Sequence, residues 1–268
     1  MGFFYISFLA IVQGITEFLP VSSSGHLILI SELFNQPDQT LQVDVAAHFG
    51  SLLAVIIFYK KDFKSLVKGL YKNLTLNFFD NEARFFRLIV LATIPVICCG
   101  FILKFTGFIY EIRSLKVIGF GVIIFGIILY LSDKYGKKNR VESDWSSKDA
   151  LIMGVWQALA LIPGTSRSGN TISGAMFLGF SRESSVKLSL IMSIPTIFAS
   201  SVLLFIDFVN VDFENANYLI LVQSALLSFI AAIGALSILV KFVRTHNFMP
   251  FVIYRLMLGL LILFLAFS

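Results

Sequence analysis

The chain has 268 residues, of which 57% are hydrophobic and 14% are charged, and its mean hydropathy is +0.86. About a quarter of the residues of a soluble globular domain are charged, so this composition excludes that class and indicates an integral membrane protein. The net charge of +5 matters through the positions of the cations. Lys and Arg in the connecting loops set the orientation of a membrane protein.

Long apolar runs without strict alternation predict a bundle of helices rather than a membrane β-barrel. A helix needs about 20 residues to cross the hydrocarbon core. Six stretches of about this length predict transmembrane helices: 43–60, 84–104, 114–132, 184–207, 217–242 and 249–267. We therefore interpret the whole chain, 1–268, as a single integral membrane domain.

Two further apolar stretches are interrupted by polar residues, glycine and proline. The first, 1–33, contains TEFLPVSSSGH (16–26), and the second, 147–178, contains PGTSRSG (163–169). The first stretch lacks the basic region and small-residue cleavage site of a signal peptide, so we expect it in the mature protein.

The loop charges predict how these two interrupted stretches lie in the membrane. The connections at 60–87 and 134–148 are rich in Lys and Arg and should be cytoplasmic, whereas NVDFENAN (210–217) has no cation and should lie outside. These sides agree with six spans only if 1–33 and 147–178 each return to the side from which they enter. Each is then a re-entrant helical hairpin, and both chain ends lie outside.

The two interrupted stretches also resemble each other. Aligning Gly25 with Gly169 places Gln13 opposite Gln157 and SSSG (22–25) opposite SRSG (166–169). A hairpin followed by three spans would then occur twice, in halves of about 1–132 and 147–268. An odd number of crossings inverts the second half relative to the first. The predicted fold is an all-α polytopic membrane protein with six transmembrane helices and two re-entrant hairpins in an inverted-topology repeat.

Three ionisable residues stand out in these hairpins: Glu17, His26 and Arg167. An ionised group in a membrane helix costs about 2.5–3.5 kcal/mol on insertion scales, so it persists where it is paired or faces a polar cavity. If the hairpin tips meet, the three side chains converge on one cavity that opens outward.

Such a cavity would suit a phosphate. Glycine- and serine-rich turns at helix starts offer backbone N–H groups and hydroxyls, and Arg167 adds a bidentate cation. His26 can exchange a proton and activate a neighbouring serine. Glu17 could orient His26 or, with Gln13, bind a hard divalent cation. The predicted phosphate-binding residues are Arg167, Ser22, Ser24, Gly25, Ser166, Ser168 and Gly169.

Each of these residues also has an ordinary structural explanation. Serine and glycine often serve close helix packing in membranes, a lone histidine can be interfacial, and a lone arginine can cap a helix. The convergence of Glu, Ser, His and Arg on two matched segments favours a site. We interpret His48 and His246 as structural. Arg255 is expected to extend to the cytoplasmic surface, with a substrate role as the alternative.

QGITEFLPVSSSGH (13–26) and PGTSRSG (163–169) resemble the two signature motifs of the bacterial undecaprenyl pyrophosphate phosphatase (BacA, bacitracin-resistance) family. The resemblance covers the whole chain in length, span count and motif placement. It implies a metal-dependent enzyme, using Mg²⁺ or Ca²⁺, that converts undecaprenyl pyrophosphate to undecaprenyl phosphate, the lipid carrier of cell-wall synthesis. Type 2 lipid phosphatases have similar motifs, but they place a histidine where this chain has Ser173.

Carried over to this chain, the resemblance makes Ser23 and His26 catalytic, Glu17 the second carboxylate of the acidic motif, and Arg167 the phosphate-binding arginine. Gln13 stands where the family has Glu or Gln. An amide can still bind a metal, but it cannot act as a base, so that task would fall to Glu17 or His26.

The sequence thus predicts a polyprenyl diphosphate phosphatase of the bacterial cytoplasmic membrane, with its active site facing outward. Its expected partners are the lipid substrate and the bilayer, not nucleic acid, and its small-residue helix faces allow a homodimer. Two alternatives stay open. Water instead of Ser23 could attack phosphorus, and a lipid flippase or transporter could share the broken-helix architecture.

Overall fold

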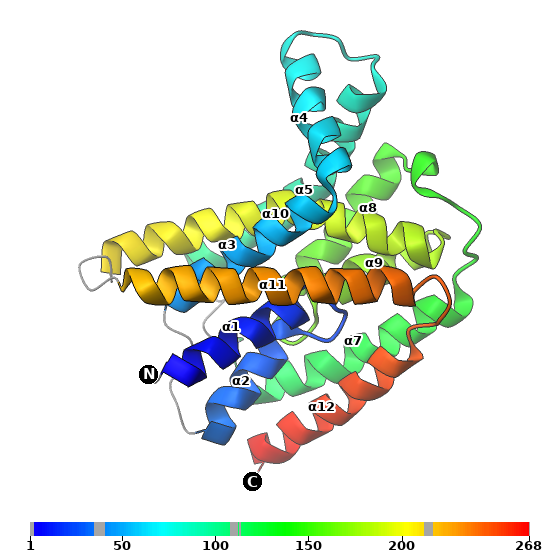
Figure 1. Ribbon diagram of the computed structural model, residues 1–268. Coiled ribbons are helices and arrows are strands. Elements are labelled where there is room, and N and C mark those ends of the chain that lie inside the picture. The colour runs from blue at the N-terminus through cyan, green and yellow to red at the C-terminus, as the bar shows by residue number, and fades with distance from the viewer. Residues whose placement is uncertain (1–2, 35–40, 108–111, 113, 212–216, 268) are drawn as a thin grey trace.

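The computed structural model describes residues 3–34, 41–107, 112, 114–211 and 217–267, and the described residues form helices joined by turns, without a β-strand (Figure 1). Two short 3₁₀ turns, Glu142–Asp144 and Leu159–Leu161, flank α8. The α-helices are α1 (Phe3–Phe18), α2 (Ser23–Phe34), α3 (Leu41–Phe58), α4 (Lys60–Leu74), α5 (Asn81–Thr106), α7 (Leu115–Tyr135), α8 (Ser147–Ala158), α9 (Arg167–Phe177), α10 (Arg182–Val211), α11 (Tyr218–Phe242) and α12 (Met249–Phe267).

Six of these helices are long and apolar enough to cross a membrane: α3, α5, α7, α10, α11 and α12. They coincide with the six predicted stretches, so this prediction is confirmed at the level of length and composition. The helices are apolar on their outer faces too. Phe101, Phe205 and Phe264, for example, are more than half exposed, as expected for side chains that contact lipid.

The basic connection at 60–87 contains a helix, α4, that was not predicted. This helix follows α3 after a break at Tyr59 and packs along the start of α5, so that the pair projects from the bundle (Figure 1). Lys72 pairs with Asp80 and Glu82 at 2.7 Å each and joins the two helices.

The chain ends and the basic connections lie at opposite ends of the bundle. Residues near both termini lie at the lower left in Figure 1, whereas the α4–α5 projection and the loop before α8 lie at the upper right. This arrangement agrees with the charge-based prediction that the termini and these two loops face different sides. Asp212 and Glu214 of the acidic connection lie outside the described residues.

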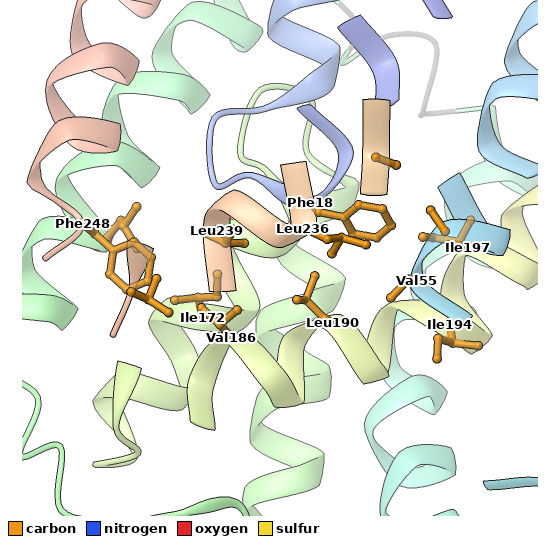
Figure 2. Packing of buried hydrophobic residues seen from close by; sticks show 14 of the residues in the cluster. Phe18, Val55, Ile172, Val186, Leu190, Ile194, Ile197, Leu236, Leu239 and Phe248 are labelled. Carbon is orange, nitrogen blue, oxygen red and sulfur yellow. The ribbon is translucent and has the colours of Figure 1, made fainter. Parts of the chain in front are cut away.

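Close packing at small residues holds the helices together. A side chain at Gly50 of α3 would collide with the carbonyl group of Ala225 on α11, so the two backbones meet there. A row of buried apolar side chains runs beneath the broken segments, with Phe18 at the end of α1 beside Leu236 of α11, and with Ile172 of α9 in the same cluster (Figure 2).

The start of α8 is anchored by a partly buried ion pair outside the six spans. Arg140 donates to both oxygens of Asp149, at 3.1 and 2.6 Å, and Ser146 donates to the same carboxylate through its backbone and its hydroxyl. Burial raises the pKa of the Asp149 carboxyl, but the bonds from Arg140 and Ser146 outweigh it and hold that pKa below its usual range. The carboxylate therefore caps α8 in its ionised form.

Candidate active site

Two breaks in the helices define the centre of the molecule. The first turn, residues 19–25, joins α1 to α2, and the second turn, residues 163–169, leads into α9. Proline stands in each turn, at Pro20 and Pro163, where it removes a backbone donor and prevents a continuous helix. Both interrupted stretches thus contain two separate helices, as predicted. Their return to the same side of the membrane stays a prediction.

The two turns have matching backbones. Ser22 and Ser166 both occupy the left-handed region that favours glycine, with φ of 73° and 72°. Their hydroxyls accept from the N–H groups of Gly25 and Gly169, at 3.3 and 3.2 Å. Each serine hydroxyl also lies 3.2 Å from that of the serine two residues later. The matched SSSG and SRSG sequences therefore fold into the same local structure, with a helix N-terminus beginning at Ser23 and at Arg167.

Direct hydrogen bonds join the two turns to each other. The N–H of Gly164 donates to Ser24 Oγ at 3.1 Å, and Ser168 Oγ donates to the carbonyl oxygen of Leu19 at 2.9 Å. The residues in contact are about 140 positions apart in the chain. The predicted meeting of the two interrupted segments is thus present in the structure.

Glu17 and Arg167 form an ion pair across this junction. Arg167 Nη2 lies 2.6 Å from Glu17 Oε1, and the side chains are only 15% and 8% exposed. Gln13 Nε2 donates to the other oxygen, Glu17 Oε2, at 2.8 Å. The carboxylate is therefore held by an amide one turn earlier on α1 and by a cation from the second turn. A buried pair of this kind leaves a costly unpaired charge if either partner is removed.

His26 is fixed through both of its ring nitrogens. Nδ1 lies 2.7 Å from the carbonyl oxygen of Ser22, and Nε2 lies 2.6 Å from the hydroxyl of Tyr254 on α12. The expected hydrogen bond between His26 and Ser23 is not made in this structure, and Ser23 Oγ has no hydrogen-bond partner among the described residues. Ser23 is half-buried at the start of α2, so its hydroxyl is free to meet a ligand.

The expectation that Arg255 extends to the membrane surface is wrong. Its side chain is 0% exposed. The guanidinium donates to the carbonyl oxygens of Thr165 and Gly164, at 2.9 and 3.3 Å, and of Pro20, at 3.4 Å, while Nε donates to that of Val122 at 3.1 Å. Arg255 is drawn inward because both turns leave carbonyl groups without a helical donor, and a buried carbonyl needs one. One arginine therefore ties the first turn to the second.

Tyr254 was not among the predicted site residues, because a tyrosine within an apolar helix has the pattern of ordinary lipid-facing surface. Its contact with His26 depends on the packing of α12 beside α2 in the folded chain. The rings of His26 and Tyr254 stack with centroids 5.5 Å apart and planes 11° apart. By contrast, the interpretation of His48 and His246 as structural agrees with their contacts. His48 Nδ1 lies 2.9 Å from the Asp44 carbonyl oxygen, and His246 stacks on Phe242.

A groove of about 420 Å³ reaches the His26–Tyr254 pair from the side of the bundle. Its walls come from α1, the first turn and α12, and they are mainly apolar. The polar site thus adjoins an apolar groove. The groove is lined by Val12, Ile15, Thr16, Leu19, Val21, His26, Pro250, Phe251 and Tyr254.

The predicted metal ligands, Gln13 and Glu17, both have side-chain oxygen atoms, the kind of ligand that Mg²⁺ and Ca²⁺ prefer. Gln13 Oε1 is buried and has no hydrogen-bond partner among the described residues, and Glu17 lies one turn further along α1. The described part of the chain contains no cluster of three or more His, Cys, Asp or Glu side chains that would form a complete metal site. These two residues fit a divalent cation only if a ligand supplies further oxygens.

The fold and the site together define a class of protein: a polytopic helical membrane protein whose polar centre is built where two broken segments meet. A sequence model described as "Bacitracin resistance protein BacA" matches residues 6–261. The chain therefore belongs to the bacitracin resistance protein BacA family, as the resemblance of its motifs indicated.

Curated relatives match over nearly the full length of the chain. An undecaprenyl-diphosphatase of Ruegeria pomeroyi is 45% identical over 269 residues, and one of Jannaschia sp. is 44% identical over 269 residues, each alignment covering 100% of both chains. An undecaprenyl-diphosphatase of Hahella chejuensis is 40% identical over 260 residues, which is 97% of this chain and 96% of that protein.

Proposed function

We propose that this protein is an undecaprenyl-diphosphatase of the bacterial cytoplasmic membrane. It removes the terminal phosphate from undecaprenyl diphosphate and leaves undecaprenyl phosphate and inorganic phosphate, so that the lipid carrier of cell-wall synthesis is recycled. The observation that carries the proposal is the junction of the two turns, where Arg167, Glu17 and two serine-rich helix starts meet. Membership of the family and the names of the relatives support the same activity.

The diphosphate would bind where α2 and α9 begin. The N-terminus of each helix carries partial positive charge and free N–H groups, which favour an anion. Arg167 would turn part of its guanidinium from Glu17 to the phosphate oxygens, because a planar fork can serve two anions. The serine hydroxyls and Gly25 and Gly169 would complete the phosphate-binding surface.

In the proposed reaction, the Ser23 oxygen forms a bond to the outer phosphorus while the bond from that phosphorus to the bridging oxygen breaks. His26 accepts the hydroxyl proton at Nε2, where the Tyr254 hydroxyl changes from donor to acceptor, and undecaprenyl phosphate leaves. Water then cleaves the phosphoserine and releases inorganic phosphate. Ser23 suits this role because its hydroxyl is uncommitted and stands at a helix N-terminus. In the alternative division of labour, water attacks directly and Ser23 only binds phosphate.

A divalent cation, Mg²⁺ or Ca²⁺, would be held by Gln13 and Glu17 together with oxygens of the substrate. When bound, the ion neutralises charge on the phosphate oxygens. The buried, unpartnered Oε1 of Gln13 supports this assignment.

The proposed membrane arrangement has two re-entrant hairpins, an inverted-topology repeat and a site that faces outward. Three observations support it. The two turns match in backbone, α1 packs on α11 while its counterpart α8 packs on α5, and the chain ends lie opposite the basic connections (Figure 1). The isoprenoid tail would stay in lipid beside the spans, with its first units in the groove that adjoins His26.

Purified protein in detergent tests this proposal directly, since no transport is possible there. We expect phosphate release from undecaprenyl diphosphate with Mg²⁺, its loss on chelation, and a fall of at least about 10²-fold in Ser23→Ala. Ser237→Ala, an exposed serine on α11, is the matched control and should keep full activity. Wild-type protein that releases no phosphate would overturn the proposed function. Trapping labelled phosphate on wild type but not on Ser23→Ala would separate the covalent route from direct attack by water.

A further inference from the structure

The helix α12 supplies a residue that contacts the proton-accepting side chain of the site. This helix contributes two adjacent side chains to the centre, and Arg255 is occupied by four carbonyl oxygens of the backbone. Tyr254 points to His26 instead, with its hydroxyl 2.6 Å from Nε2 and its ring stacked on the imidazole at 11°.

The partner of Nδ1 decides which hydrogen the histidine carries. The carbonyl oxygen of Ser22 can only accept, so the Nδ1 atom that lies 2.7 Å from it must carry the hydrogen. In the neutral ring, Nε2 is then the acceptor, and the Tyr254 hydroxyl donates to it. Nε2 is therefore the atom through which His26 can take up a proton, and Tyr254 is the residue that contacts it.

A tyrosine hydroxyl has a property that a carbonyl partner lacks. It donates to a neutral Nε2 and accepts from a protonated one, so it can hold the ring in place in both protonation states. The nearly parallel tyrosine ring adds an offset stacking contact with the imidazole. A phenylalanine at this position would keep that contact and lose only the hydrogen bond.

We propose that Tyr254 is a positioning residue for His26, which holds Nε2 in the orientation for proton exchange at the site and fixes the Nδ1-protonated tautomer together with the Ser22 carbonyl. The kinetic part of this inference rests on the proposed function; the structural part does not. Tyr254 itself comes from the opposite end of the sequence, 228 residues after His26.

The first test is spectroscopic and needs no activity. The chain has only three histidines, so ¹⁵N-histidine labelling gives three imidazoles, with His48 and His246 as internal references. At pH 8, where imidazole is neutral, we expect the His26 Nε2 resonance of Tyr254→Phe to move toward that of a nitrogen without a hydrogen bond. The His48 and His246 resonances should not move. An unchanged His26 resonance in a folded variant would overturn the proposal.

The second test is kinetic, with phosphate release from undecaprenyl diphosphate as the readout. Tyr254→Phe should lower kcat by about 3- to 10-fold, the effect of one hydrogen bond, with KM nearly unchanged. The exposed Tyr218 at the start of α11 provides the matched control, and Tyr218→Phe should behave as wild type.

A double variant distinguishes positioning from a separate structural effect. If Tyr254 acts through His26, then His26→Ala combined with Tyr254→Phe should be no slower than His26→Ala alone. Losses that multiply would overturn the proposal. An inactive wild type would refute the proposed function instead, and the ¹⁵N measurement would still decide the role of Tyr254.

Discussion

The two turns differ in how far two pairs of equivalent polar side chains are exposed. Ser24 is exposed and His26 is half-buried, but their counterparts in the second turn, Ser168 and Asn170, are 2% and 1% exposed. The Asn170 amide lies 3.2 Å from the Thr165 hydroxyl and stays within its own segment. The same backbone conformation therefore serves two purposes. The first turn is open for exchange with a ligand, and the second is a fixed frame that presents Arg167.

The middle position of the serine motif carries this difference, because Ser23 in the first turn corresponds to Arg167 in the second. Both residues begin a helix at the junction. In the proposed reaction, equivalent positions thus supply the nucleophile and the cation, one from each segment. We therefore expect substitutions of the two middle residues to have the most different effects in the two turns. Substitutions that act on the shared backbone should have nearly the same effect in both.

The largest expected effect comes from Arg167→Ala. It removes the proposed phosphate-binding group and leaves the buried Glu17 carboxylate without its cation, so kcat/KM should fall by about 10³-fold. Arg167→Lys keeps the charge but not the bidentate geometry and should recover part of the loss. Steady-state phosphate release measures both. Activity of Arg167→Ala within tenfold of wild type would contradict the role of the second turn.

Arg255→Met should destabilise both turns at once. The substitution removes the donor of carbonyl oxygens in both turns, including those of Pro20 and Thr165, and leaves them buried. We expect a loss of about 2–4 kcal/mol of stability, measured as a lower Tm in detergent. Arg244→Met, at a side chain that is 62% exposed, is the control and should change stability by less than about 0.5 kcal/mol. Equal Tm values for both variants would show that Arg255 does not hold the turns together.

The smallest effects should come from the two serines with positive φ. Ser22→Ala and Ser166→Ala each lose the bond to a glycine N–H and keep the unfavourable backbone, at a cost of about 1 kcal/mol. Ser22→Gly and Ser166→Gly lose the same bond but relieve the backbone, so they should be nearly neutral. Thermal unfolding of the four variants measures the difference. If the glycine variant were more stable than the alanine variant in one turn only, the two turns would not be energetically equivalent.

Much of this architecture could be predicted from the sequence. The six spans follow from local hydropathy, and the breaks follow from Pro20, Pro163 and the serine–glycine motifs. That Glu17 and Arg167 lie near one polar centre could be anticipated as well, because an ionised group in a membrane persists where it is paired or faces a polar cavity. These features depend on the free-energy cost of placing polar groups in lipid. That cost can be estimated from the residue types in each segment of the sequence.

Arg255 shows where such reasoning fails. An arginine near the end of an apolar helix has the same local sequence whether it extends to the surface or turns inward. Its direction depends on the carbonyl groups that the two turns leave unpaired, and these lie about 90 and 235 residues away in the chain. Tyr254 is a similar case. Its neighbours in the sequence are mostly apolar, and its hydroxyl has a partner in His26 only because α12 packs beside α2.

The membrane class, the six spans and the two interrupted segments with their ionisable residues can be recognised in the amino-acid sequence, because composition and periodicity report locally on burial in lipid. The partners of those residues depend on how the helices pack. The tertiary structure pairs Glu17 with Arg167, ties both turns to Arg255, and places Tyr254 rather than Ser23 against His26. Hydrogen-bond partners follow from the distances between packed helices, and those distances depend on contacts far apart in the chain.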